Sequence, residues 1–191
     1  MDTVDDSPAA LKAEIKRLEA EVAALRQRAE QAEALASHDV LTPALNRRGF
    51  LEVLTRQMAY CRRHGQVASL LYVDMDGFKG LNDSLGHAAG DAALIAVVHH
   101  LQDQTRQSDA VGRLGGDEFA VLLMNATLDD ARAKAESISA YLVSEGFEWD
   151  GQTLPLSASI GARALTGQSD AEVWLAEADA AMWLRKGRGR S

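Results

Sequence analysis

The N-terminal part of the chain carries apolar side chains at alternating intervals of four and three residues. These residues are Leu11, Ile15, Leu18, Val22, Leu25, Ala29, Ala32 and Ala36. β-Branched residues at the a positions and leucines at the d positions favour a parallel two-stranded coiled coil. The alternative is a single amphipathic helix packed on its own domain, but such a helix needs a wider stripe. We therefore expect a dimerisation helix over residues 8–37, preceded by an acidic, disordered segment 1–7.

Beyond residue 38, helical and strand-like patterns alternate. Helical periodicity predicts helices over 47–64, 91–107, 129–145 and 170–185. Apolar or alternating segments predict strands over 67–74 and 156–165, and a short hairpin over 147–154. The first of these strands is apolar almost throughout, which is typical of a central strand. The pattern predicts one α/β domain over residues 38–191.

Two glycines between apolar segments are followed directly by two acidic residues. Gly115 and Gly116 precede Asp117 and Glu118, and apolar residues then alternate. This pattern predicts a β-hairpin with the glycines at its tip. Glycine has no Cβ, so another molecule can approach the backbone there. The paired carboxylates are hard oxygen ligands that suit Mg²⁺ with nucleotide phosphates, although these residues alone also fit an ordinary solvated hairpin tip.

Longer motifs around this hairpin are similar to those of one family. The sequence Gly-Gly-Asp-Glu-Phe occupies 115–119, and segment 74–91 resembles the Asp-x-Asp-x-Phe-Lys-x-x-Asn-Asp-x-x-Gly-His-x-x-Gly-Asp pattern of GGDEF diguanylate cyclases at every fixed position. Similarity extends to 39–48, 159–161 and 178–190. The resemblance implies an α+β palm-like domain, similar to adenylyl cyclases and polymerases, with a mostly antiparallel central sheet flanked by helices.

The resemblance also assigns roles to individual residues. It implies a Mg²⁺ site, with Mn²⁺ as an alternative ion, formed by Asp74, the main-chain carbonyl of Met75, Asp117 and Glu118. Asp117, Glu118 and Lys79 are the implied catalytic residues. The implied substrate contacts are Gly115, Gly116, Phe78, Asn82, His87, Asp91, Lys186 and Arg190. Taken alone, Asp74 could instead be a helix N-cap, and His87 could brace a loop rather than touch the base.

Asn82 and Asp91 resemble the pair of residues with which the family binds guanine, and the chemistry of the base agrees. A carboxylate such as Asp91 can accept hydrogen bonds from both N1–H and N2–H₂ of guanine, while Asn82 can donate to O6. Adenine does not offer that pair of donors. The two residues therefore favour GTP over ATP.

Arg106-Gln-Ser-Asp109 resembles the Arg-x-x-Asp inhibitory site of the family, which binds the product cyclic di-GMP. An arginine can pair with phosphate and stack on guanine, and an aspartate can accept from the guanine edge. A surface salt bridge is the alternative. Arg132 and Lys134, on the next predicted helix, are candidates for a second basic group at this site.

Composition excludes several classes of protein. The formal charge of −8 argues against a general nucleic-acid binder, and a lone cysteine excludes an internal disulfide. We find neither a signal-peptide pattern nor an apolar run of about 20 residues, and we expect a soluble cytoplasmic protein without a membrane span.

The expected reaction joins two GTP molecules into cyclic di-GMP on a homodimer. The alternatives are a catalytically idle cyclic di-GMP receptor and a coiled-coil scaffold.

Overall fold

The computed structural model describes residues 8–188, apart from the side chains of residues 9, 10, 27–35, 187 and 188. The chain divides into two compact units, residues 1–36 and 37–191. The helices and strands, in chain order, are α1 (Pro8–Ser37), β1 (Leu45–Asn46), α2 (Arg47–His64), β2 (Ala68–Met75), α3 (Phe78–Leu85), α4 (His87–Asp103), β3 (Ala110–Gly115), β4 (Glu118–Met124), α5 (Leu128–Glu145), β5 (Phe147–Trp149), β6 (Gln152–Leu154), β7 (Ala158–Ala164) and α6 (Ala171–Arg188).

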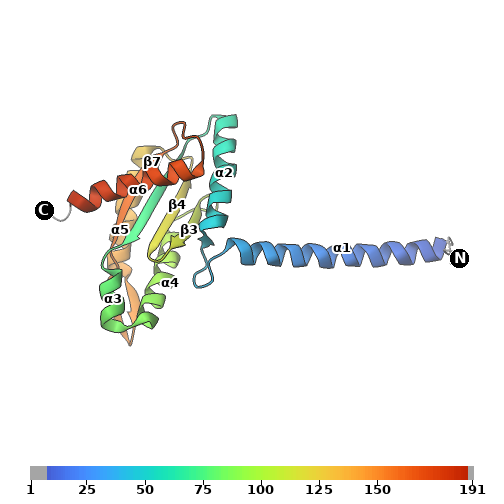
Figure 1. The fold of residues 1–191 in the computed structure, drawn as a ribbon, viewed down its shortest axis with the longest axis horizontal. Coiled ribbons are helices and arrows are strands. Elements are labelled where there is room, and N and C mark those ends of the chain that lie inside the picture. Colours follow the sequence, from blue (N-terminus) through green and yellow to red (C-terminus); the bar gives the residue numbers. More distant parts are fainter. Residues whose placement is uncertain (1–7, 189–191) are drawn as a thin grey trace. The chain divides into compact units, whose positions relative to one another are not determined.

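Helix α1 confirms the helix predicted at the N-terminus (Figure 1). The described residues of its apolar stripe, Leu11, Ile15, Leu18, Val22 and Leu25, are between 45% and 57% exposed. Arg17 forms ion pairs with Glu14 and Glu21 along the helix. The stripe is thus open to a partner, and its pairing as a coiled coil stays a prediction. The predicted segment 1–7 lies outside the described residues.

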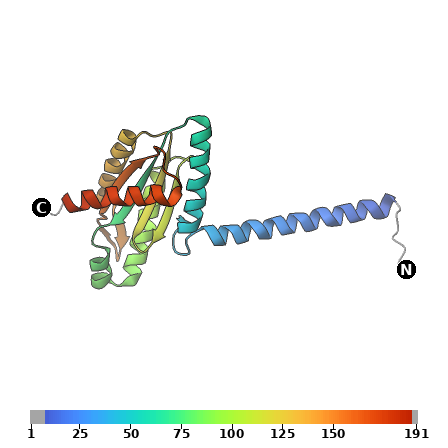
Figure 2. The ribbon, with the colours of Figure 1, turned by 45° about the horizontal axis from the view of Figure 1, so that its top comes forward.

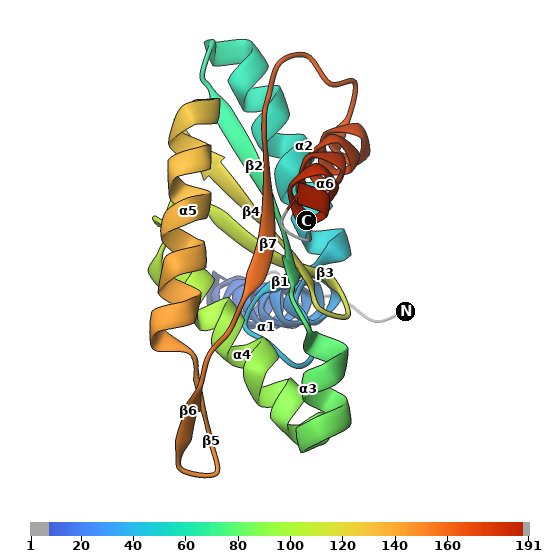
Figure 3. The same cartoon turned by 90° about the vertical axis from the view of Figure 1, so that its left-hand side faces the viewer.

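The second unit is built on a five-stranded sheet in the order β1-β3-β4-β2-β7. Strands β2, β3, β4 and β7 pair antiparallel, and β1 pairs parallel with β3, which confirms the mostly antiparallel sheet. Helices α4 and α5 cover one face, and α2 and α6 cover the other (Figure 3). Helix α6 crosses the sheet in Figures 1 and 2. This three-layer arrangement buries β2, as its apolar sequence predicted.

Two predicted boundaries are wrong. Helix α4 begins at His87 and ends at Asp103, so it is displaced toward the N-terminus from the predicted 91–107. Gly86, at φ +86°, both ends α3 and starts α4, and this sharp corner replaces the loop expected there. Arg106 therefore lies in the turn after the helix instead of closing it.

The hairpin tip is also displaced by one residue. The turn between β3 and β4 consists of Gly116 and Asp117, because the pairing shifts between Arg113 and Gly115 and takes Gly115 into β3. Gly115 (φ +150°) and Gly116 (φ +53°) both adopt backbone angles that favour glycine. None of the described helices is long and apolar enough to cross a membrane.

Candidate active site

Two carboxylates face each other across the centre of the sheet. Asp74, near the carboxyl end of β2, is the direct register partner of Glu118, the first residue of β4. Asp117 lies beside them in the turn, where its main-chain oxygen accepts a hydrogen bond of 3.2 Å from the Met75 amide. Like charges directly opposite each other on a sheet are destabilising. A cation at this end of the two strands would offset that repulsion.

Lys186 provides a positive charge at this pair. Its Nζ donates to Asp74 Oδ1 and lies 4.0 Å from Asp76 Oδ1. The side chains of Lys186 and Asp74 are only 19% and 18% exposed. The structure thus brings one of the two predicted phosphate-binding residues into the site, while Arg190 lies outside the described residues.

The donor set fits Mg²⁺ shared with a nucleotide. Asp74 and Glu118 offer hard oxygens from adjacent strands, and Asp117 and the Met75 carbonyl are next to them in the chain. Within residues 8–188, no group of three or more His, Cys, Asp or Glu side chains could hold a metal by itself. Mg²⁺ commonly takes one or two carboxylates and completes its shell with substrate phosphates. The N-cap of α3 is Gly77, so the N-cap alternative for Asp74 is wrong.

A second group of predicted residues gathers where α3 meets α4. The Asn82 Oδ1 atom is buried and is one of two buried side-chain oxygens in the described chain without a hydrogen-bond partner. A Cβ built on Gly90 would lie 2.0 Å from that oxygen, so glycine makes room for the amide. Leaving an acceptor buried and unpaired costs about 1–3 kcal/mol. A ligand that donates a hydrogen bond here would remove that cost.

The remaining predicted substrate residues surround this corner. Lys79 on α3 and His87 and Asp91 on α4 are exposed. Phe78, the first residue of α3, is half-buried and packs against the core shared with α4 and α5. Residues from two consecutive helices and from the hairpin therefore border the same end of the sheet.

Sequence reasoning missed Arg113, which fixes the hairpin turn. Its guanidinium donates to the Gly116 carbonyl at 3.0 and 2.8 Å, and to Asp39 Oδ1 at 3.0 Å. Burial opposes the charge on Asp39, but hydrogen bonds from Thr42 and Arg113 outweigh it and lower the pKa of Asp39. Arg113 directly precedes the glycine motif region, and Asp39 begins the first similar segment. Their proximity, across 74 residues, has no local sequence signal.

Tyr72 is a second residue that the pattern did not reveal. It lies on β2, and its cross-strand partner Ala120 places it diagonal to Glu118 on the same face of the sheet. Burial, together with the charge and the hydrogen bond of Glu118, raises the pKa of the Tyr72 phenol. The phenol therefore stays protonated at neutral pH and can donate to Glu118.

Arg106 and Asp109 line a cavity of about 440 Å³ on another part of the domain. Asp109 accepts from the main-chain amides of Arg106 and Met124, each at 3.0 Å. Lys134 lines the same cavity and donates to the Gln104 carbonyl at 2.9 Å. Arg132 instead pairs with Asp129 and borders a different hollow. Of the two candidate basic residues, only Lys134 borders this cavity.

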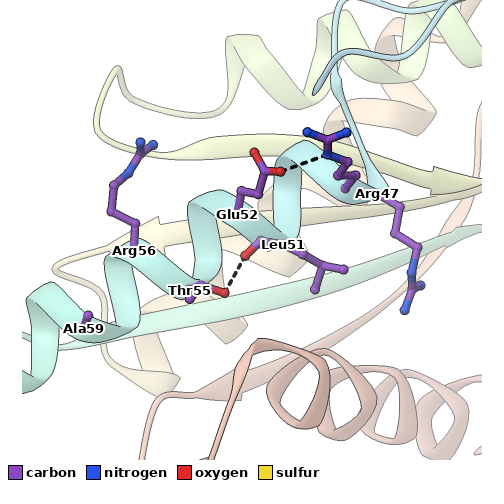
Figure 4. A pocket seen from close by; sticks show the side chains of 7 residues that line it. Arg47, Leu51, Glu52, Thr55, Arg56 and Ala59 are labelled. Atoms are coloured by element: carbon purple, nitrogen blue, oxygen red, sulfur yellow. Dashed lines mark hydrogen bonds and ion pairs between the residues drawn. The ribbon is translucent and has the colours of Figure 1, made fainter. Parts of the chain in front are cut away.

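A further hollow of about 770 Å³ lies along α2 (Figure 4). It is lined by Arg47, Arg48, Leu51, Glu52, Thr55, Arg56 and Ala59. None of the predicted site residues is among those that line it.

The chain belongs to the GGDEF family: the family described as "Diguanylate cyclase, GGDEF domain" matches residues 36–191. It is 38% identical over 154 residues to the diguanylate cyclase DosC of Escherichia coli K12, which covers 80% of this chain and 34% of DosC. It is 40% identical over 157 residues to the diguanylate cyclase TpbB of Pseudomonas aeruginosa PAO1, which covers 81% of this chain and 36% of TpbB. The chain thus spans about a third of the length of these relatives.

Solved structures show the same fold. The coiled coil and GGDEF domain of DgcB from Caulobacter crescentus, in complex with c-di-GMP, is 27% identical with a TM-score of 0.83, covering 94% of this chain and 96% of that one. The GGDEF domain of TpbB from Pseudomonas aeruginosa is 39% identical with a TM-score of 0.74, covering 79% and 89%. These likenesses confirm the predicted family and fold.

Proposed function

We propose that this chain is a diguanylate cyclase, which joins two GTP molecules into cyclic di-GMP and releases two pyrophosphates. The observation that carries the proposal is the facing pair Asp74 and Glu118 with Lys186 beside it. A receptor that only binds cyclic di-GMP has no need of this arrangement. Membership of a family of cyclases supports the same conclusion.

Each part of the site has a role in this reaction. Asn82 and Asp91 would bind guanine: Asp91 would accept from N1–H and N2–H₂, and the Asn82 amide, for which Gly90 leaves room, would donate to O6. Lys79 and Lys186 would offset the charge that develops on the phosphates. Asp74, Glu118, Asp117 and the Met75 carbonyl would hold the ion. The chemistry supplied by bound Mg²⁺ is polarisation of the α-phosphate and a lower pKa of the ribose 3′-hydroxyl.

The bond changes are those of nucleotidyl transfer. The 3′-oxygen of one GTP forms a bond to the α-phosphorus of the other, and the bond from that phosphorus to the pyrophosphate oxygen breaks. The 3′-hydroxyl proton passes to the carboxylate of Asp117, to that of Glu118 or to a water molecule of the metal site. The 3′-oxygen of the second GTP then attacks the α-phosphorus of the first in the same way, which closes the ring and releases the second pyrophosphate.

The first experiment incubates the purified chain with GTP and Mg²⁺ and separates the products by chromatography. We expect cyclic di-GMP from the parent and from Asp103→Asn, a control that removes an exposed carboxylate at the end of α4. We expect none from Asp117→Ala or Glu118→Gln. Equal product from Glu118→Gln and the parent would contradict the assigned site. Mn²⁺ in place of Mg²⁺ tests the second ion.

A homodimer through α1 forms part of the proposal. One domain would hold one GTP, so two domains must meet, and a coil over 8–37 would keep them at high effective concentration. Leu18→Glu with Leu25→Glu places charges in the seam, whereas Lys16→Glu with Ala23→Glu places them outside it. Leu18→Glu with Leu25→Glu should abolish the dimer, as measured by light scattering. The same variant should make no cyclic di-GMP at low protein concentration. Equal loss in both pairs would refute the role of the seam.

Product inhibition is the proposed role of the cavity at Arg106 and Asp109, whose size and charges favour a guanine nucleotide. This cavity also favours the second candidate function, an idle cyclic di-GMP receptor. If the parent makes no product but carries bound cyclic di-GMP, the variant Arg106→Ala distinguishes an inhibited cyclase from an idle receptor. Activity released by this change would indicate an inhibited enzyme, and continued silence would indicate a receptor. The cytoplasmic location and the absence of nucleic-acid binding stay predictions.

A further inference from the structure

Asp76, the residue that follows β2, is held by two serines: Ser159 lies on the neighbouring strand β7, and Ser157 directly precedes that strand. Ser157 Oγ donates to Asp76 Oδ2 at 3.0 Å, and Ser159 Oγ donates to Asp76 Oδ1 at 2.8 Å. The Asp76 amide also donates to the Ser157 carbonyl at 2.8 Å. Both carboxylate oxygens and the backbone are therefore fixed, although the side chain of Asp76 is 37% exposed.

The two carboxylates beside Lys186 differ in what surrounds them. Among the described residues, the Asp74 carboxylate accepts a side-chain hydrogen bond from Lys186. The Asp76 carboxylate instead accepts hydrogen bonds from two serines. A metal ion at Asp74 would have one lysine to displace, whereas at Asp76 it would compete with two hydroxyl hydrogen bonds that already orient the carboxylate. Asp74 is therefore suited to the ion and Asp76 to the lysine.

We infer that Asp76 is a positioning residue for Lys186. When nucleotide and ion occupy Asp74, Lys186 loses that contact, and Asp76, oriented by Ser157 and Ser159, keeps the ammonium group beside the phosphates. The inference rests on the proposed function, since it concerns the same nucleotide site. Asp76 touches no reacting atom in this arrangement and acts through the lysine.

A double-mutant cycle on nucleotide binding tests this role. The probe is 3′-deoxy-GTP with Mg²⁺, which cannot condense because it lacks the attacking hydroxyl, and its affinity is measured by calorimetry on the full chain. Asp76→Asn keeps the size of the side chain and removes its charge. We expect it to weaken binding about fivefold in the parent and not at all in Lys186→Ala, because the two residues act as one unit.

Three further variants make the result specific. In Asp76→Asn combined with Lys79→Ala, the fold-losses of nucleotide affinity of the two single variants should multiply. Lys79 lies on α3 and is independent of Asp76 in this arrangement. Ser157→Ala with Ser159→Ala should weaken binding in the same direction as Asp76→Asn, since the charge remains but its orientation is lost. Asp103→Asn should bind as the parent does.

The outcomes separate this inference from the proposed function. Equal losses from Asp76→Asn with and without Lys186 would overturn the positioning role, as would tighter binding by Asp76→Asn. A coupled cycle in a chain that makes no cyclic di-GMP, neither as the parent nor as Arg106→Ala, would uphold the role of Asp76 and overturn the cyclase. If the chain makes cyclic di-GMP but the losses from Asp76→Asn and Lys186→Ala simply add, the cyclase would be upheld and the role of Asp76 overturned.

Discussion

The contact between Arg113 and Asp39 allows a quantitative test, because it joins the hairpin turn to the segment that begins the domain. The perturbation is Arg113→Met, which keeps the length of the side chain and removes its charge. It deletes the 3.0 Å bond to Asp39 and both bonds to the Gly116 carbonyl. The side chains of Arg113 and Asp39 are only 13% and 17% exposed, so water compensates poorly.

The magnitude follows from these contacts. Hydrogen bonds that involve charged groups contribute about 1.5–3 kcal/mol, and Thr42 still donates to Asp39 at 2.9 and 2.8 Å after the change. Arg113→Met should therefore lower the free energy of unfolding by about 2 kcal/mol, near the lower end of that range. For a domain of this size that corresponds to about 4–8 °C in the melting temperature.

The assay is urea unfolding followed by tryptophan fluorescence. Trp149, Trp174 and Trp183 all lie in the second unit, so the signal reports on that unit. Arg48→Met is the matched control, because its partner Glu52 and Arg48 itself are 60% and 70% exposed, and such pairs contribute about 0.5 kcal/mol or less. A loss in Arg113→Met no larger than in the control would refute the reasoning.

The pH dependence of the same pair gives an independent check. Because the folded pKa of Asp39 is lowered, its ionised form stabilises the fold above the unfolded pKa of about 4, and this contribution is lost as the pH falls through the folded value. The stability difference between the parent and Arg113→Met should therefore be full at pH 7 and shrink below about pH 4. A difference that is constant down to pH 2 would contradict the assignment.

Two further predictions concern the nucleotide sites. Gly90→Ala should weaken GTP binding about tenfold, because its Cβ would displace the Asn82 amide; Gly80→Ala, whose Cβ meets nothing within 4 Å, is the control, and equal KM values would contradict the argument. Lys134→Ala should weaken inhibition by cyclic di-GMP about fivefold, because Lys134 lines the cavity of Arg106, whereas Arg132→Ala should not. Inhibition curves with added product test this, and identical curves would exclude Lys134.

The sequence alone predicted much of the local structure, because short-range chemistry specifies it. Helix α2, between the Asn46 N-cap and Gly65 in the left-handed conformation, has the predicted bounds 47–64. The hairpin of β5 and β6 turns at Asp150 and Gly151, both with positive φ. Prediction was wrong at Gly86, where two helices meet at one residue and the apolar pattern alone gives no boundary.

The sequence also proposed the residues of the site, because the family motifs give the residue types at fixed spacing. It could not decide which carboxylate meets which cation. Lys186 lies 112 residues from Asp74 in the chain, and their contact depends on α6 crossing the sheet. Asp76 is distinguished from Asp74 by two serines, Ser159 on β7 and Ser157 just before it, which donate to Asp76. Strand register and helix docking are long-range packing events, so tertiary structure alone determined these pairings.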